Sequence, residues 1–334
     1  MKFALFGCGR IGRMHAENIA ANPRATLSCV YDVISQAASE VAASHHCKVV
    51  GSAEEALADD GIEAVLIASS TDTHADLLEA AARAGKAVFC EKPIDLSLER
   101  VEKCGAVIAG CDVPVQIGFN RRFDPGHLAA KRALEAGEIG DLHQVIITSR
   151  DPEIPPRAYL ESAGGLFRDM TIHDFDLARF MLGEEPEDVF AIAGALGDPE
   201  LGAAIDENDS AMIIMRTASG KMCHINNSRS AVYGYDQRVE LLGDKGMVIS
   251  GNRKAHELRR YSGTETEIGQ PYLYFFIERY REAYIAELDA FIDAVEQGIP
   301  CQAGFDDGRR ALILAEAAYR SLRSGAMVKV EEAG

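Results

Sequence analysis

Gly7-Cys8-Gly9-Arg10-Ile11-Gly12 matches the pattern G-x-G-x-x-G in a setting that is specific for one fold. Apolar residues 2–6 come directly before it, and a helical pattern begins within it. In such a turn the first glycine allows a tight bend, the second lets the backbone approach a pyrophosphate, and the third lets the helix pack against the strand. Asp32 stands twenty residues beyond Gly12, at the end of the next predicted strand, where a carboxylate can hold a ribose. Because these requirements are met together, the stretch predicts a dinucleotide-binding Rossmann fold rather than an ordinary glycine turn.

Asp32 also predicts which dinucleotide is bound. A carboxylate at this position accepts hydrogen bonds from both ribose hydroxyls and repels a 2′-phosphate. Residues 33–36 contain no lysine or arginine that could receive that phosphate. We therefore expect NAD rather than NADP.

The first 119 residues alternate short apolar runs with alanine-rich helical patterns, which is typical of βαβ units and a parallel sheet. The predicted strands are residues 2–6, 26–31, 64–69, 87–90 and 113–118, and the predicted helices are residues 11–21, 73–84 and 97–109. Gly85 follows the second of these helices, where a residue free to adopt a positive φ is favoured. The pattern in this part of the sequence predicts an α/β Rossmann domain, with a doubly wound parallel sheet, over residues 1–119.

After residue 120 the predicted strands follow one another with only turns between them, which indicates a mainly antiparallel sheet. These strands are residues 145–150, 189–195, 210–217, 221–227, 237–242 and 247–250. Two long helical patterns, residues 275–296 and 306–324, and a short strand, residues 327–330, close the chain. We expect residues 120–334 to form an α+β domain with a large mainly antiparallel sheet, for substrate binding and oligomerisation.

The composition excludes several classes of protein. With 34 basic and 52 acidic residues, the net charge of −18 opposes binding to a nucleic-acid backbone. No apolar run approaches the ~20 residues needed to cross a bilayer, and residues 1–6 are typical of a first strand rather than a signal peptide. The eight cysteines form no C-x-x-C pair and no Cys/His cluster at zinc spacing. We expect reduced thiols, a cytoplasmic location and no metal.

Two further segments carry residues suited to chemistry. Glu91-Lys92-Pro93 ends a predicted strand at the edge of the sheet where ligands of doubly wound folds bind. In residues 164–176, Asp169, His173 and Asp176 would share one face of a continuous helix. A carboxylate beside an imidazole can orient it and stabilise its protonated form, as a proton acceptor in alcohol oxidation requires. The alternatives are a solvated charge pair for Glu91 and Lys92, and a structurally paired histidine for His173.

These segments fall in the order found in the glucose-fructose oxidoreductase and inositol dehydrogenase family, which the chain resembles over essentially its whole length. The resemblance rests on the glycine stretch with Asp32, on Ser69-Ser70-Thr71-Asp72-Thr73-His74, on Glu91-Lys92-Pro93, on Gly118-Phe119-Asn120-Arg121-Arg122-Phe123-Asp124 and on the segment of Asp169 and His173. Residues 149–152, 169–176 and 231–236 resemble bacterial inositol 2-dehydrogenases in particular. The pair Ser69-Ser70 departs from the Thr-Pro that is more common in the family.

The resemblance implies roles for individual residues. It implies that Lys92, Asp169 and His173 are catalytic. It implies a polyol pocket lined by these three together with Arg121, Arg122, Asp176, Tyr235 and Tyr284. The resemblance leaves open which of the two arginines faces the pocket. It implies that the cofactor is held by Gly7, Gly9, Arg10, Ile11, Gly12, Asp32, Ser69, Ser70, Thr71, His74, Glu91, Lys92 and Asn120. It also implies a homotetramer.

We therefore expect an NAD-dependent dehydrogenase that oxidises one secondary hydroxyl of a cyclic polyol, foremost myo-inositol to 2-keto-myo-inositol. His173 would accept the hydroxyl proton, Asp169 would orient its imidazole, and Lys92 would stabilise the developing alkoxide. Two alternatives stay open: a dehydrogenase of another inositol isomer or sugar, and an NAD-binding regulator without turnover. The joint presence of the three residues favours the enzyme, because a sensor needs none of them.

Overall fold

The computed structural model describes residues 1–331, which divide into two compact units. The first unit contains residues 1–123 and 282–312, and the second contains residues 124–281 and the segment from 313 onward. This division differs from the expected boundary, because residues 282–312 join the first unit. The reason is packing: Phe291 contacts the rings of Phe3 and Phe89 at centroid distances of 6.1 and 5.7 Å, in the core of the first sheet.

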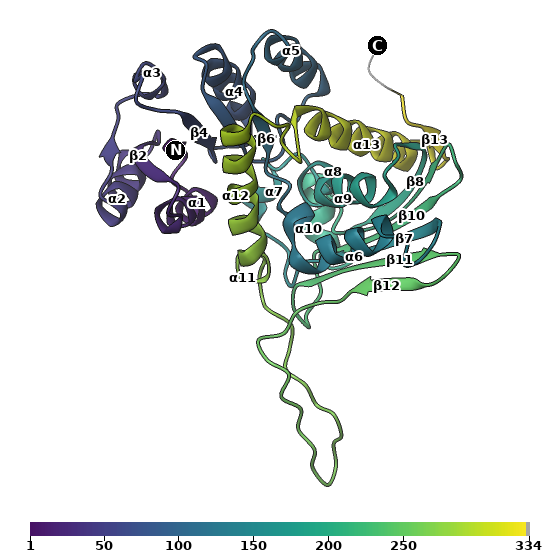
Figure 1. Ribbon diagram of the computed structural model, residues 1–334. Coiled ribbons are helices and arrows are strands. Elements are labelled where there is room, and N and C mark those ends of the chain that lie inside the picture. The colour runs from purple at the N-terminus through teal and green to yellow at the C-terminus, as the bar shows by residue number, and fades with distance from the viewer. Residues whose placement is uncertain (332–334) are drawn as a thin grey trace. The chain divides into compact units, whose positions relative to one another are not determined.

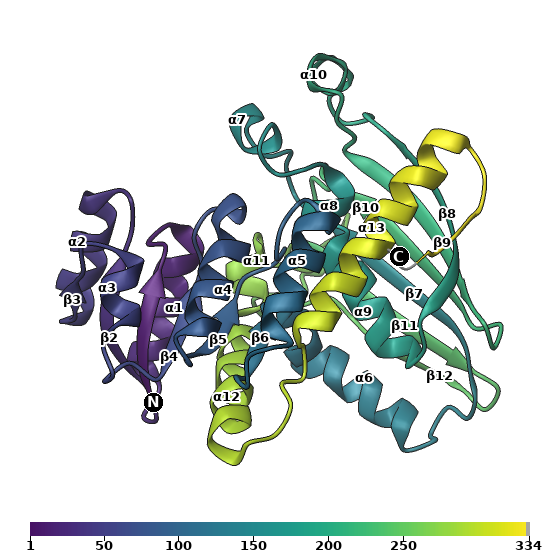
Figure 2. The same cartoon turned by 90° about the horizontal axis from the view of Figure 1, so that it is seen from above.

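The first unit is built on a parallel sheet of six strands in the order β3-β2-β1-β4-β5-β6 (Figure 2). The strands are β1 (Lys2–Phe6), β2 (Thr26–Tyr31), β3 (Lys48–Val49), β4 (Ala64–Ile67), β5 (Ala87–Cys90) and β6 (Val115–Ile117). Its helical elements are α1 (Arg10–Ala21), α2 (Ser35–His45), α3 (Ala53–Leu57), η1 (Thr71–Thr73), α4 (His74–Arg83), α5 (Leu98–Ile108), η2 (Asn120–Phe123) and most of α12 (Arg281–Gln297). The expected Rossmann fold is confirmed.

The strand register brings the loops of the first unit to one edge. Phe6 at the end of β1 pairs with Tyr31 of β2 on one side and with Ile67 of β4 on the other. Ile67 in turn pairs with Cys90 of β5. The loops that follow these four strands therefore leave the sheet side by side, at the edge where nucleotides bind in this fold.

The second unit contains a sheet of seven strands in the order β12-β11-β7-β10-β9-β8-β13 (Figure 1). The strands are β7 (Leu142–Arg150), β8 (Pro186–Gly194), β9 (Ser210–Thr217), β10 (Met222–Ser228), β11 (Asp236–Gly243), β12 (Met247–Ser250) and β13 (Val328–Lys329). Neighbouring strands are antiparallel except for β7 and β10. The helices are α6 (Pro125–Glu135), α7 (Arg157–Leu160), α8 (Leu166–Asp169), α9 (Ile172–Leu182), α10 (Pro199–Ile205) and α11 (Phe276–Arg279), and α13 (Phe305–Ser324) continues into this unit. The expected α+β architecture is confirmed.

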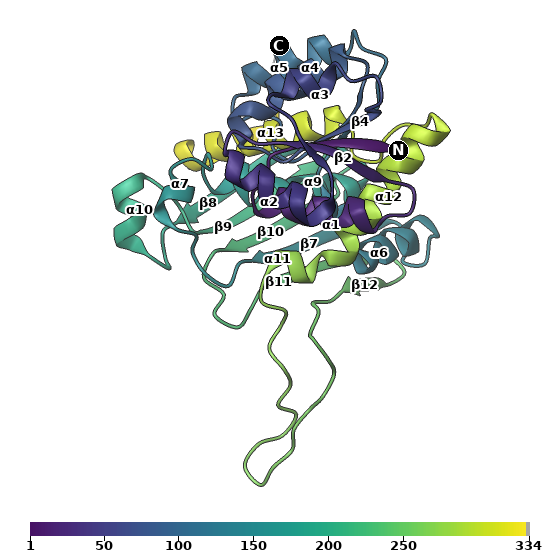
Figure 3. The ribbon, with the colours of Figure 1, turned by 90° about the vertical axis from the view of Figure 1, so that its left-hand side faces the viewer.

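The two faces of the seven-stranded sheet differ. Helix α9 packs against β7 and β10 on one face, and the Ala191 amide of β8 donates to the Ser321 hydroxyl of α13. On the other face Met212 and Ile214 of β9 are 50% and 47% exposed. Between β12 and α11, residues 251–275 project from the unit as a long extended segment, seen in Figures 1 and 3.

Two predicted helices are interrupted. The expected helix of residues 275–296 consists of α11 and α12, which are separated at Tyr280. The expected continuous helix carrying Asp169 and His173 consists of α8 and α9, separated by Met170 and Thr171. Within residues 1–331, none of the helices has the length and apolar character required to cross a membrane.

Candidate active site

The glycine stretch has the geometry of a phosphate-binding turn. Gly7 has a φ of +95°, and a Cβ there would overlap the backbone of Ala68 and Ser69. A Cβ on Gly12 would overlap the Gly7 carbonyl, so this glycine allows α1 to lie against β1. By contrast, a Cβ on Gly9 would meet nothing within 4 Å. The space in front of Gly9 is therefore open, at the N-terminus of α1, where backbone N–H groups favour an anion.

Asp32 follows β2 and connects it to this turn. Its Oδ2 accepts a hydrogen bond from the Cys8 amide at 2.6 Å, and its Oδ1 accepts from the Ile34 amide at 2.7 Å. Val33 and Ile34 beside it are 84% and 64% exposed. Burial, followed by the charge of Asp32, raises the pKa of the Cys8 thiol to about 12, so this thiol stays protonated.

The loop after β4 is bonded to the loop after β5. Ser69 Oγ and Thr73 Oγ1 lie 2.7 Å apart, and Thr73 Oγ1 donates to the Ser70 carbonyl at 2.8 Å. The buried His74 lies between two backbone carbonyls, with Nδ1 2.8 Å from Pro93 O and Nε2 3.1 Å from Ser69 O. Both ring nitrogens of His74 thus lie at hydrogen-bond distance from backbone carbonyls. We therefore expect His74 to contribute to the cofactor site by shaping these loops. Thr71 is the first residue of η1, in the segment after β4.

Glu91 is held inside the first unit, and Lys92 next to it is partly exposed. Glu91 Oε1 lies 2.7 Å from Nε2 of His15, a fully buried histidine on α1. A Cβ on Gly118 would lie 2.8 Å from Glu91 Oε2, so the glycine makes room for the carboxylate. The glutamate therefore fixes the strand end from which Lys92 projects.

The segment after β6 contains three buried polar residues. Arg122 donates to the Gln302 carbonyl at 2.6 Å and to Asp307 Oδ1 at 2.8 Å, which uses its guanidinium within the first unit. Arg121 is only 3% exposed. Among the residues that the structure describes, Asn120 Nδ2 is buried without a hydrogen-bond partner. Such an atom is costly unless a ligand satisfies it, so Asn120 fits the expected cofactor contact.

In the second unit, Asp169 and His173 lie at the junction of α8 and α9. The Thr171 amide donates to the Leu166 carbonyl at 3.0 Å, five residues back, and this interrupts the regular helix. The expected single face of Asp169, His173 and Asp176 is therefore wrong for Asp169, and only the last two share the regular spacing of α9. Both Asp169 and His173 are partly exposed in a largely buried segment. Partial exposure leaves both side chains within reach of a ligand.

The Asp169 carboxylate is bonded through both oxygens. Tyr159 donates its hydroxyl to Oδ1 at 2.8 Å, and Arg229 donates to Oδ2 at 2.8 Å. Nearby, Asn227 accepts from the Thr171 hydroxyl at 2.7 Å and donates to Asp174 Oδ2 at 2.8 Å. These two hydrogen bonds attach the start of α9 to strand β10.

The remaining expected pocket residues are buried. In the second unit Asp176 is 0% exposed, with Arg179 Nη1 at 3.8 Å, and Tyr235 is 4% exposed. Tyr284 instead belongs to the first unit, where it is 6% exposed and packs edge-on against His15 at a centroid distance of 5.8 Å. Tyr284 therefore packs against the same histidine that contacts Glu91.

Sequence reasoning did not identify Tyr159, Arg229, Asn227 or His15. Tyr159 and Arg229 lie 10 and 60 residues from Asp169 in the chain, and no periodicity relates such positions. Within residues 1–331, no group of three or more histidine, cysteine or acidic side chains could hold a metal ion.

A Rossmann unit with an open glycine turn and a carboxylate at the end of β2, joined to a unit with a candidate acid–base pair, defines the class of NAD-binding oxidoreductases. Residues 1–119 match the family model described as "Oxidoreductase family, NAD-binding Rossmann fold", and residues 131–330 match "Oxidoreductase family, C-terminal alpha/beta domain". The chain belongs to this oxidoreductase family, GFO/IDH/MocA, and its cofactor is NAD.

Similar proteins match over the full length. Inositol 2-dehydrogenase of Rhizobium meliloti is 47% identical over 99% of both chains. A crystal structure of a putative myo-inositol dehydrogenase from Sinorhizobium meliloti has a TM-score of 0.96 at 46% identity, covering 99% of this chain and 100% of that one. A scyllo-inositol dehydrogenase from Lactobacillus casei, solved with NAD(H) and scyllo-inositol, has a TM-score of 0.88 at 30% identity over 99% of both chains.

Proposed function

We propose that this NAD-dependent dehydrogenase oxidises one secondary hydroxyl of myo-inositol and releases 2-keto-myo-inositol, NADH and a proton. The observation that carries the proposal is the partly exposed pair of Asp169 and His173, in a chain related over its full length to an inositol 2-dehydrogenase. Such a pair supplies the proton acceptor that alcohol oxidation requires.

The proposed mechanism divides the work among three side chains. The imidazole of His173 accepts the proton of the reacting hydroxyl. The Asp169 carboxylate stabilises the imidazolium that forms, and the Lys92 ammonium stabilises the developing alkoxide. Bound NAD supplies the acceptor for the hydride, which leaves the carbon that carries the reacting hydroxyl.

The proposed cofactor contacts follow the geometry of the first unit. The first turn of α1, including Arg10 and Ile11, would receive the pyrophosphate in front of Gly9. Asp32 would accept from the ribose, and the exposed Val33 and Ile34 would contact the adenine. The loops with Ser69, Ser70 and Thr71, Glu91 and Lys92, and Asn120 would line the nicotinamide end.

The proposed substrate contacts are Lys92, Arg121, Asp169, His173, Asp176 and Tyr235. Carboxylate, guanidinium and phenol groups offer both donors and acceptors to a ring rich in hydroxyls. A site built in this way rejects ligands that leave its buried polar groups unpaired. Arg122 is left out because Asp307 and Gln302 already hold its guanidinium.

A dehydrogenase of another inositol isomer is the second candidate, because a related structure contains scyllo-inositol. An NAD panel with myo-inositol, scyllo-inositol, glucose and an acyclic polyol separates the candidates, with NADH absorbance as the readout. We expect myo-inositol to give the highest kcat/KM. If scyllo-inositol or glucose is turned over well while myo-inositol is inert, the substrate assignment is wrong and the dehydrogenase assignment remains.

The catalytic roles are tested with His173→Ala and Lys92→Ala. Loss of a positioned general base costs about 10² to 10⁴ in rate, so His173→Ala should lower kcat by that factor. Lys92→Ala should also lower kcat strongly, because it removes alkoxide stabilisation. NAD affinity, measured by fluorescence titration, should stay near wild type in His173→Ala. If a variant keeps the wild-type kcat, the role assigned to the replaced residue is wrong.

We further propose a cytoplasmic homotetramer that acts in inositol catabolism. All eight cysteines are free in the structure, as expected in a reducing compartment. The exposed apolar face of the seven-stranded sheet, with Ile192, Met212, Ile214, Met222 and Ile249, supports self-association.

A further inference from the structure

Asp169 is clamped by two side chains from different parts of the second unit. Arg229 follows the end of β10 and is 2% exposed, and its backbone amide donates to the Asp209 carbonyl at 2.7 Å. One guanidinium nitrogen of Arg229 donates to Asp169 Oδ2 at 2.8 Å. Tyr159 lies on α7, and its hydroxyl donates to Asp169 Oδ1 at 2.8 Å. Each carboxylate oxygen therefore has its own donor.

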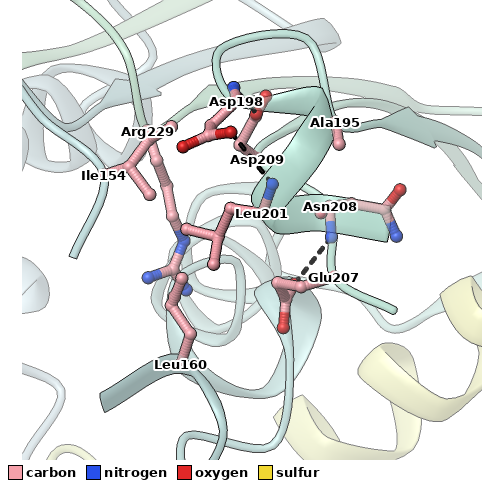
Figure 4. A pocket seen from close by; sticks show the side chains of 10 residues that line it. Ile154, Leu160, Ala195, Asp198, Leu201, Glu207, Asn208, Asp209 and Arg229 are labelled. Atoms are coloured by element: carbon pink, nitrogen blue, oxygen red, sulfur yellow. Dashed lines mark hydrogen bonds between the residues drawn. The ribbon is translucent and has the colours of Figure 1, made fainter. Parts of the chain in front are cut away.

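The surroundings make the Arg229 charge effective. Figure 4 shows its side chain at a cavity of about 10 Å³ that is lined by the apolar Ile154, Leu160 and Leu201 and also by polar residues, among them Glu207 and Asp209. Because Arg229 is only 2% exposed, the interaction of its guanidinium with the carboxylate is screened less than at a surface. Burial alone lowers the pKa of Arg229, yet the carboxylates of Asp169 and Asp151 raise it overall.

The short helix that carries Asp169 is held at other points as well. Glu207 accepts from the Leu166 amide at the start of α8 at 3.0 Å. Arg168 donates to Glu316 of α13 at 2.6 Å and stacks on Tyr319 at 4.9 Å from its ring centroid. The backbone of α8 is thus fixed independently of Arg229 and Tyr159. Their bonds to Asp169 then serve the carboxylate itself rather than the helix.

We propose that Arg229 and Tyr159 are positioning residues for Asp169: Arg229 keeps the carboxylate ionised, and Tyr159 sets the direction of Oδ1. This inference rests on the proposed catalytic role of Asp169. Without the Arg229 cation, the protonated forms of Asp169 and His173 gain stability, because a positive charge nearby opposes proton uptake. The site then needs a higher pH to provide an unprotonated base.

The experiment compares pH profiles of kcat/KM for myo-inositol oxidation in the full-length enzyme. In wild type, the rate should rise with pH through an apparent pKa of the coupled Asp169–His173 site. In Arg229→Gln this acidic limb should move up by about one pH unit, the lower part of the range for a carboxylate beside an arginine. Arg229→Lys keeps the charge, so its limb should return to the wild-type position although kcat stays reduced. Tyr159→Phe keeps every charge; we expect about a tenfold lower kcat and a shift of less than half a pH unit.

A matched control is Arg279→Gln, because Arg279 is 1% exposed and donates to the buried Asp124 elsewhere in the second unit. It should lower the melting temperature without moving the limb. Tyr159 is 48% exposed, so Tyr159→Phe keeps the test decisive even where Arg229→Gln fails to fold. An unmoved limb in Arg229→Gln, or wild-type kcat in Tyr159→Phe, overturns the assignment of that residue. Asp169→Asn separates the two levels: if it retains wild-type kcat, the catalytic role of Asp169 itself fails.

Discussion

At the scale of single residues, the Asp32 carboxylate links the end of β2 to the glycine turn. Its Oδ2 accepts from the Cys8 amide inside the glycine turn, and its Oδ1 accepts from the Ile34 amide. An ionised carboxylate is a strong acceptor for such N–H groups. The same carboxylate orders the turn, and we propose that its negative charge also holds the ribose.

Replacing Asp32 tests this charge. Asp32→Ser should lower kcat/KM for NAD about tenfold to a hundredfold, because hydrogen bonds to a charged group are worth about 1.5 to 3 kcal/mol each. The ratio of NADP to NAD efficiency should rise, since the repulsion of the 2′-phosphate disappears. Asp32→Asn is the control, because its amide oxygen can still accept from the Cys8 amide while the charge is lost. An unchanged cofactor preference in both variants means that Asp32 does not hold the ribose.

At the scale of elements, helix α1 lies close to the end of β1 because Gly12 carries no side chain. Gly7 has a φ of +95° against the backbone of Ala68, and Gly12 lies against the Gly7 carbonyl. A side chain at Gly12 would push α1 away from the end of β1, whereas one at Gly7 would collide with the loop after β4. Gly9 between them has an ordinary φ of −72° and open space in front of it.

Gly9→Ala and Gly12→Ala should therefore behave differently. Gly12→Ala should lower the melting temperature by several degrees, because overpacking costs about 1 to 3 kcal/mol. Gly9→Ala should fold with a melting temperature near wild type and lose NAD affinity at least tenfold, since the methyl group fills the space proposed for the pyrophosphate. Calorimetry and NAD titration on both variants measure the contrast. Full NAD affinity in Gly9→Ala would place the pyrophosphate elsewhere.

At the scale of the whole molecule, one face of the seven-stranded sheet carries several exposed apolar side chains, among them Met212 and Ile214. Ile214 lies in register with His224 of β10 and Phe190 of β8 on this face. Exposed apolar residues gathered on one face mark an association surface in soluble proteins. Symmetric homo-oligomers commonly bury such faces against a second copy.

Ile214→Glu should disrupt the proposed homotetramer. A carboxylate in the centre of an apolar interface must be desolvated without a partner, so the assembly should dissociate to smaller species. Light scattering after size exclusion gives the mass, against 36.1 kDa for one chain. Ile299→Glu is the control, because Ile299 is 49% exposed and belongs to the first unit, not to the seven-stranded sheet. A wild-type protein that elutes as a monomer contradicts the proposal.

Features that depend on neighbouring residues could be predicted from the amino-acid sequence. The glycine stretch and the strand before it predicted the Rossmann fold, because a phosphate-binding turn requires these backbone conformations at fixed spacing. Gly85 has the predicted positive φ, +71°, after α4. Strands β1, β2, β5, β9 and β12 have the bounds that apolar patterning indicates, since burial of one or both faces imposes that pattern.

Features that depend on residues far apart in the chain became visible in the folded structure. Phe291 assigns residues 282–312 to the first unit through contacts with Phe3 and Phe89. The hydrogen bond between Thr171 and Asn227, 56 residues apart, accompanies the break between α8 and α9 that no helical pattern indicates. Arg229 reaches Asp169 across 60 residues. Local patterns record which face of an element is buried, whereas the choice of partner for a buried charge or ring is made when the elements pack.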